Sequence, residues 1–267
     1  MNRLVTIGIV TAFALTGTAC MTPAAMQRTS TAPVGDTAAE QPWVKAQNVV
    51  RATGNDLSRG GLQAVRPHVA ELEQALSDGK PLFGMNASNP GIVFSDGPTE
   101  SLGLLLIAGS MGRQVSAIAN PYPAASFFLG SYYNEVGRFA DALRVLDQGL
   151  VLTAMPGSDL GETAPLILGE RGAALNALKR YQASLDNFDR ALKIKALKDD
   201  QRALMQRGRG FALTELGRLD EAEQAYRDSL KSEPNNPRAQ NELTYIQRLR
   251  AGGPMAPSQL FTRMPQM

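Results

Sequence analysis

The stretch GFALTELGRLDEAEQAYRDSLKSEPNN, residues 210–236, decides the fold because its pattern occurs three times in succession. The two upstream copies read GSYYNEVGRFADALRVLDQGL at residues 130–150 and GAALNALKRYQASLDNFDRAL at residues 172–192. Each copy reads as a helix, a short turn and a second helix. We therefore interpret residues 124–234 as three helical hairpins, and the remaining sequence leads into or away from them.

The three copies agree position by position when residues are counted from their first glycines, Gly130, Gly172 and Gly210. The residues twelve positions on are small and those sixteen positions on are large: Ala142, Ser184 and Ala222, then Leu146, Phe188 and Tyr226. Small residues are expected where two helix backbones approach closely, and large ones where the gap between helices needs filling. No such hairpin buries both of its faces alone, so each one needs a neighbour.

This pattern resembles the tetratricopeptide repeat, a helix pair that stacks into a right-handed solenoid with a concave binding face. The resemblance covers residues 123–236 and is strongest in the third copy. The second copy departs most, because it has Lys179 at the turn glycine, Ser184 at the usual alanine and Ala196 at the closing proline. The first glycines lie 42 and 38 residues apart, whereas the family repeat is near 34 residues, so extra residues separate the copies.

The expected fold class is all-α. Residues 123–250 are predicted to form a TPR-like α-solenoid of about three helix pairs plus a C-terminal capping helix. Asn236 can cap that last helix, with Pro237 in its first turn. Residues 43–122 form a mostly helical N-terminal region with a long Gly/Pro loop, and residues 251–267 are expected to be a disordered tail.

Within the N-terminal region the sequence predicts short elements. We expect a helix at residues 43–51 that Thr53, Gly54 and Asn55 end, and a longer helix at residues 61–76 that Pro67 kinks or starts. The later elements are a Gly/Pro loop at residues 79–98, a strand at 92–94, an apolar helix from 99 or 100 through 108, and an ambiguous segment at 115–119. The apolar helix is too short to span a bilayer, so we expect it to be buried against the first repeat.

Composition and charge are those of an ordinary helical protein. The 267 residues are 43% hydrophobic and 6% aromatic, and 27 basic against 25 acidic side chains leave a net charge of +2. A balance this close to neutral gives no electrostatic attraction for nucleic acid.

Residues 1–19 have the features of a signal peptide: one basic residue, an apolar run and small residues before Cys20. The run Gly17, Thr18, Ala19 and Cys20 resembles a bacterial lipoprotein signal, although that motif more often has leucine where Gly17 stands. The resemblance implies a diacylglycerol thioether and an N-acyl (palmitate) chain on Cys20, with residues 20–42 as a lipid-attached flexible tether. Because no aspartate follows the cysteine, it also implies the outer membrane and a periplasm-facing chain. The alternative is a plain signal peptidase site and a soluble periplasmic protein.

Catalytic and metal-binding patterns are weak. Ser101 lies in TESLG, which lacks the first glycine of a nucleophile elbow, and the only histidine, His68, lies upstream of it. One histidine and one cysteine cannot supply a metal site, and the Gly-rich loop lacks the spacing that holds phosphate. We therefore expect no catalytic residue, no metal and no cofactor.

The resemblance also implies where a partner would bind, because the first helix of each tetratricopeptide pair lines the groove. The matching inward positions are Phe127, Ser131, Asn134, Gly169, Ala173, Asn176, Arg207, Phe211 and Thr214. We expect an apolar, amide-lined groove that accepts an extended or helical peptide segment, with Phe127 and Phe211 as anchors. The alternative is that these two aromatic side chains pack under neighbouring helices.

Two functions follow as hypotheses. The first is a non-enzymatic, membrane-tethered scaffold that holds another envelope protein in assembly, secretion or cell-wall maintenance. The second is an envelope enzyme with a site in residues 55–123 that acts on glycan or peptide, with the repeats as its platform.

Overall fold

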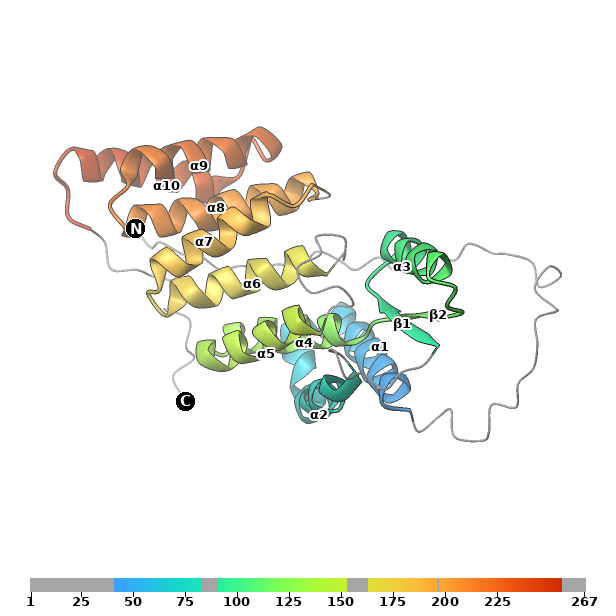
Figure 1. Cartoon of the computed structure of the whole chain (residues 1–267). Coiled ribbons are helices and arrows are strands. Elements are labelled where there is room, and N and C mark those ends of the chain that lie inside the picture. Colours follow the sequence, from blue (N-terminus) through green and yellow to red (C-terminus); the bar gives the residue numbers. More distant parts are fainter. Residues whose placement is uncertain (1–40, 83–90, 153–162, 196, 256–267) are drawn as a thin grey trace.

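Helices make up most of the chain in the computed structural model, which describes residues 41–82, 91–152, 163–195 and 197–255 (Figure 1). The repeat region consists of α4 (Tyr122–Glu135), α5 (Phe139–Val151), α6 (Ala164–Ala177), α7 (Tyr181–Leu192), α8 (Asp199–Glu215), α9 (Leu219–Ser232) and α10 (Pro237–Arg250). Each helix packs on the next, and among the inner helices α6 also contacts both α4 and α8. The expected series of three hairpins with a closing helix is confirmed.

The contact inside each hairpin joins the first glycine to the large residue sixteen positions later. A Cβ atom added to Gly172 would lie 2.3 Å from the ring of Phe188. At Gly130 it would lie 2.4 Å from Leu146. At Gly210 it would lie 2.9 Å from the ring of Tyr226. Since real Cβ atoms do not approach this closely, the missing side chain is what lets the two helices meet.

The turn within each hairpin also repeats. Gly137, Lys179 and Gly217, each seven positions after the first glycine, have φ angles of 76°, 58° and 74°. In every copy the next amide, that of Arg138, Arg180 or Arg218, donates back to a carbonyl five residues earlier, at 2.7, 2.8 and 2.9 Å. This is the Schellman motif that closes helices at a left-handed residue. Lys179 adopts the same conformation without the freedom of glycine, at a cost of about 1–2 kcal/mol.

The N-terminal region packs on the first hairpin through a shared core. Val65, Leu72, Tyr122, Leu129 and Leu146 are buried in a single hydrophobic cluster. Separate, smaller clusters lie beneath the second and third hairpins. The first hairpin is therefore covered by the N-terminal region on one side and by the second hairpin on the other.

The first predicted helix end is wrong. Helix α1 (Pro42–Gly60) continues through Thr53, Gly54 and Asn55. The Thr53 side chain is buried and its hydroxyl donates to the Val49 carbonyl at 2.8 Å. A Cβ on Gly54 would lie 3.7 Å from the Phe128 ring, so this part of α1 faces helix α4. Packing against α4 outweighs the weak helix propensity of these residues.

The second predicted helix is divided. A 3-10 helix, η2 (Leu62–His68), contains Pro67 and leads into α2 (Val69–Gly79) and a short 3-10 turn, η3 (Lys80–Leu82). Pro67 lacks the amide that an α-helical interior needs, so the regular helix begins only after it. The part of the Gly/Pro loop at residues 83–90 lies outside the described residues, as do Cys20, residues 153–162, Ala196 and the tail from residue 256.

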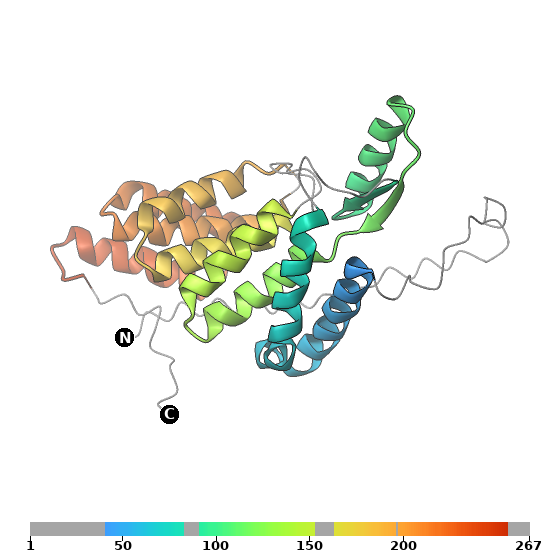
Figure 2. The same ribbon diagram turned by 60° about the horizontal axis from the view of Figure 1, so that its bottom comes forward.

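A small parallel sheet follows. Strand β1 (Ile92–Ser95) lies where a strand was expected, and the ambiguous segment forms its partner β2 (Ser116–Ala119), with Ile92 opposite Ser116. Helix α3 (Pro98–Ser110) connects them. The expectation that this helix is buried against the first repeat is wrong, because α3 packs on β1 and β2 instead. Figure 2 shows α3 standing out from the rest of the molecule at this end.

Replacing Gly172 by alanine is expected to destabilise the protein by about 1–3 kcal/mol, because the new methyl group overlaps the Phe188 ring. Urea denaturation followed by circular dichroism measures the change. Gly103→Ala in α3 is the matched control, since no described atom lies within 4 Å of a Cβ there. That control should be neutral or stabilising by about 0.5–1 kcal/mol. Equal destabilisation by both substitutions would contradict the packing argument.

Candidate functional site

The inner face is the surface that helices α4, α6 and α8 share, and it carries all the sequence-predicted groove residues. Phe127, Ser131 and Asn134 lie on α4, Gly169, Ala173 and Asn176 on α6, and Arg207, Phe211 and Thr214 on α8. Because α6 contacts both α4 and α8, residues more than seventy positions apart in sequence are brought onto one face.

The two aromatic side chains proposed as anchors are buried. Phe127 is 7% exposed and its ring centroid lies 6.0 Å from that of Phe128. Phe211 is 4% exposed and its ring packs edge-on to Tyr181 at 6.4 Å. Thr214 is also buried, and its hydroxyl donates to the Gly210 carbonyl at 2.9 Å. In this structure these side chains fill space between helices, and of the nine predicted groove residues only Asn134 and Arg207 are partly exposed.

Asparagine side chains link the inner helices. Asn134 of α4 donates from Nδ2 to the Glu170 carbonyl of α6 at 3.0 Å. Asn176 of α6 makes the equivalent bond to the Gly208 carbonyl of α8 at 3.3 Å. Both asparagines stand four positions after their first glycine, and both acceptors stand two positions before the next one. One asparagine in each of the first two hairpins therefore ties adjacent inner helices together.

The oxygen atoms of these amides are left unpaired. Asn134 Oδ1, Asn176 Oδ1 and Gln206 Oε1 have no hydrogen-bond partner within the described chain. A buried acceptor without a partner costs about 1–3 kcal/mol. Because the three atoms are shielded from solvent, this cost belongs to the folded chain itself, and they offer no exposed acceptor to a partner.

Glu170 is a buried acid that the sequence pattern did not single out. It lies on α6 next to Gly169, is 4% exposed, and accepts from Asn134 Nδ2 at 2.7 Å. Burial raises the pKa of the Glu170 carboxyl, and the nearby charge of Glu135 adds to the shift, although the hydrogen bond from Asn134 opposes it. The only sequence signal was its place between predicted groove positions.

The far end of the inner face is basic. Arg207 of α8 donates to Glu233 Oε2 at 2.6 Å, and Asn236 donates to the same oxygen at 2.6 Å. Arg238, in the first turn of α10, has its pKa lowered by burial and by the charge of Arg207. Two guanidinium groups therefore lie close together with Glu233, where sequence reasoning had identified only Arg207.

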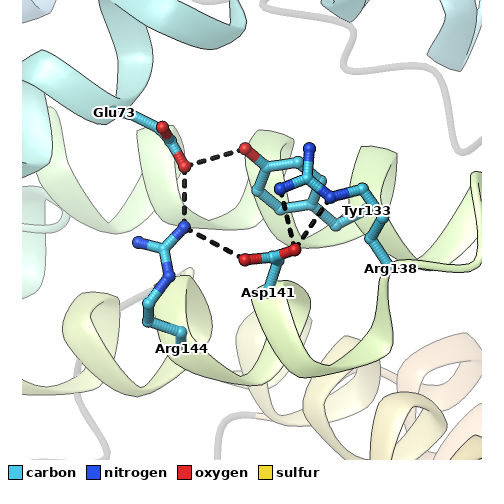
Figure 3. Close-up of polar contacts among 5 residues, drawn as sticks. All are labelled: Glu73, Tyr133, Arg138, Asp141 and Arg144. Atoms are coloured by element: carbon cyan, nitrogen blue, oxygen red, sulfur yellow. Dashed lines mark hydrogen bonds and ion pairs between the residues drawn. The ribbon is translucent and has the colours of Figure 1, made fainter.

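A second polar network fixes the N-terminal region to the first hairpin (Figure 3). Glu73 of α2 accepts from the Tyr133 hydroxyl at 2.8 Å and from Arg144 at 2.7 Å. Arg138 lies over the Tyr133 ring and donates to Asp141 at 2.8 Å. Burial and the Glu73 carboxylate raise the pKa of Tyr133 to about 12. Burial alone would raise the pKa of Glu73, but the Arg144 and Tyr133 bonds outweigh it and lower that pKa.

The two residues considered for catalysis, Ser101 and His68, make hydrogen bonds elsewhere in the structure. The Ser101 hydroxyl lies 2.6 Å from the Ser95 hydroxyl and 3.0 Å from the Gly97 carbonyl that accepts from it. His68 Nε2 pairs with Asp56 at 2.9 Å. Among the described residues no group of three His, Cys, Asp or Glu side chains is placed to hold a metal ion. Nor is any helix within the described ranges both long enough and apolar enough to cross a membrane.

Comparisons with known proteins agree with this architecture. Residues 163–232 match the tetratricopeptide repeat family, which covers the second and third hairpins. No curated protein matches the chain. MamA (residue 41 to the end) from Desulfovibrio magneticus RS-1 is similar in structure, with a TM-score of 0.50 and 15% identity over 78% of this chain and 86% of that one. The all-α, TPR-like fold is therefore established.

Two further solved structures are similar over about half of the chain. The first TPR domain of human RPAP3 has a TM-score of 0.42 and 24% identity, over 49% of this chain and 94% of that one. The first TPR of Spaghetti (RPAP3), bound to an HSP90 peptide, has a TM-score of 0.43 and 24% identity over 50% and 97%.

The buried carboxyl of Glu170 makes stability depend on pH. The pKa of Glu170 in the folded chain lies above its ordinary value of 4.5, so the unfolded chain releases this proton at a lower pH than the folded chain does. The free energy of unfolding of the wild type therefore falls as the pH rises from the ordinary value to the raised pKa. Glu170→Gln cannot ionise. We expect its Tm, relative to wild type, to increase from about pH 5 to about pH 8. Glu71→Gln, at an exposed glutamate of α2, is the control for removing a surface carboxyl group.

A Tm difference between Glu170→Gln and wild type that stays constant across this pH range would show that Glu170 is not held in a destabilised charged form. Differential scanning calorimetry of the three proteins in matched buffers gives the measurement. Comparing variant with wild type cancels the contribution of every other titrating group.

Proposed function

We propose that this protein is a non-enzymatic scaffold that holds a peptide segment of another envelope protein on its inner face. The observation that carries this proposal is the inner face itself, where α6 contacts both α4 and α8 and the side chains of Asn134 and Arg207 are partly exposed. An extended segment presents backbone N–H and C=O groups along its length, and the amide and guanidinium side chains of this face can bond to them. The amides bind without transferring protons, because they do not titrate near neutral pH.

The basic end of the inner face supports a further property of the partner. Arg207 and Arg238 lie close together, and Glu233 is the carboxylate that Arg207 pairs with. Their side chains favour an additional anionic group, which would form charge-assisted hydrogen bonds there. The proposed partner segment therefore carries an acidic side chain or a terminal carboxylate at the end that meets α8 and α10.

The proposed setting is the bacterial cell envelope, where such a scaffold would serve assembly, secretion or cell-wall maintenance. A lipid on Cys20 would hold the protein at the outer membrane with the repeats facing the periplasm. The support is the sequence before Cys20, which resembles a lipoprotein signal, and this segment lies outside the described residues. A soluble periplasmic form is the alternative outcome.

A photo-crosslinking amino acid at position 206 tests the inner face. Gln206 is partly exposed on α8 and directly precedes Arg207, so the probe would lie close to a segment bound at the inner face. We expect irradiation of bacterial envelopes to crosslink the protein to a single partner protein in a 1:1 ratio. Mass spectrometry of the crosslinked peptide identifies the segment, which should include an acidic residue.

The matched control places the same probe at Gln224. This glutamine is exposed on the outer helix α9 and bonds to Asp228 of the same helix at 3.1 Å. Position 224 should give no crosslink to that partner. The same products from both positions, or none from position 206, would refute binding at the inner face.

The lipid anchor has its own test. Globomycin blocks the peptidase that processes lipoprotein precursors, so we expect treated cells to accumulate a larger precursor of this protein. Cys20→Ser should give the same larger form without the drug, because the modified residue is absent. An unchanged size in both experiments would exclude lipoprotein processing and favour the soluble periplasmic form.

A further inference from the structure

Helix α3 presents an apolar face to its surroundings. Five large hydrophobic side chains on it and at its end are exposed: Leu102 (61%), Leu105 (40%), Leu106 (65%), Ile107 (47%) and Met111 (68%). Between residues 101 and 112 the sequence contains no charged side chain. We call these five residues the α3 patch.

The opposite side of α3 is fixed to the sheet, so the direction of the patch is set. Glu100 is 1% exposed and accepts from the Asp96 amide, and Ser101 pairs with Ser95 of β1. Asp96 in turn accepts from Thr163, at the start of the second hairpin, at 2.7 and 2.8 Å. A helix held on one side in this way cannot rotate to bury its leucines within the described chain.

The size and chemistry of the α3 patch favour a lipid surface over a protein partner. Side chains of this size at these exposures present on the order of 500 Å² of apolar surface, a size at which patches are usually functional. A stable protein dimer needs about 800 Å² from each partner. The patch is also purely aliphatic apart from one methionine, and it lacks the aromatic and arginine side chains that dominate protein interfaces.

Charge at the edge of the patch fits a membrane surface. Arg113 follows Met111 by two residues, is exposed, and is held near the helix end by a bond from its amide to the Ala108 carbonyl at 2.9 Å. Its guanidinium would lie at the depth of lipid phosphates if the patch entered the acyl region. At thirteen residues, α3 is too short to span a bilayer and would lie along its surface.

The sheet that carries α3 also packs against α1, the first helix of the described chain. Helix α1 begins at Pro42, and the Trp43 ring packs on Phe94 of β1 at 6.0 Å. Further along α1, Gln47 donates to the carbonyl of Ala119, the last residue of β2, at 2.8 Å. The sheet therefore has α1 on one face and α3 on the other.

We infer that α3 is a membrane-surface helix, which lays the α3 patch into the periplasm-facing leaflet of the outer membrane and adds a second contact to the proposed lipid on Cys20. This inference rests on the envelope placement proposed above. It does not depend on which partner occupies the inner face.

A fluorescent probe tests the inference in the full chain with Cys20→Ser, which removes both the lipid and the competing thiol. Leu106→Cys is labelled with a polarity-sensitive dye. On addition of vesicles of phosphatidylethanolamine with some phosphatidylglycerol, we expect its emission to shift to the blue and to be quenched by nitroxide-labelled acyl chains. A further Leu102→Gln substitution should lower the vesicle partition coefficient measured with this dye about tenfold.

Val151→Cys, labelled in the same way, is the matched control, since Val151 is also 65% exposed but lies on α5. Its emission should not change with vesicles, although it carries the same N-terminal residues. No vesicle-dependent change at position 106, or equal changes at both positions, overturns the inference. A blue shift at position 106 that depends on protein concentration without vesicles overturns it in favour of a second copy of the chain. Because the vesicles contain no protein, failure here leaves the crosslinking result at position 206 unaffected.

Discussion

The close contact between a glycine on one helix and a large side chain on its partner determines the geometry of every hairpin. Gly172 leaves room for the Phe188 ring, and the same ring also occupies the space above Gly208 of the third hairpin. Phe188 therefore sets two distances, one within its hairpin and one to the next. Only when these distances are short can Asn176 reach the Gly208 carbonyl, so this hydrogen bond between inner helices depends on the apolar contact.

The repeat region was predictable because its determinants are local. Each hairpin contains its own glycine, turn residue and filling side chain within about twenty-one positions, so the pattern can be read by aligning the copies. The turn at Lys179 shows that the repeat geometry is kept even where the residue type changes. Although the residue departs from glycine, its backbone adopts the same left-handed conformation, since the helices on both sides leave the chain no other path.

The rest of the structure depends on contacts between residues distant in sequence. Gly54 and its neighbours look like a helix end, yet they lie inside α1 because Phe128 packs beside them. Glu170 looks like a surface glutamate, and only Asn134, thirty-six residues earlier, shows that it is buried. The α3 patch is the reverse case. An apolar run predicts burial, but the small sheet covers just one side of the helix, and no local pattern reveals how much cover a neighbour will provide.

The two proposed surfaces are connected through a short, hydrogen-bonded junction, and this connection bears on how they are oriented. Strand β2 ends at Ala119 and α4 begins at Tyr122, so the sheet beneath α3 runs almost directly into the first inner helix. Asn120 closes this junction, because its side chain donates to the Leu152 carbonyl at 2.8 Å and accepts from the Tyr122 amide at 3.2 Å. The bonds of Glu73 to Tyr133 and Arg144 brace the same hairpin from α2. If α3 rests on a membrane, these contacts fix the direction in which the inner face points, and a partner segment would be held at a defined orientation to the lipid surface.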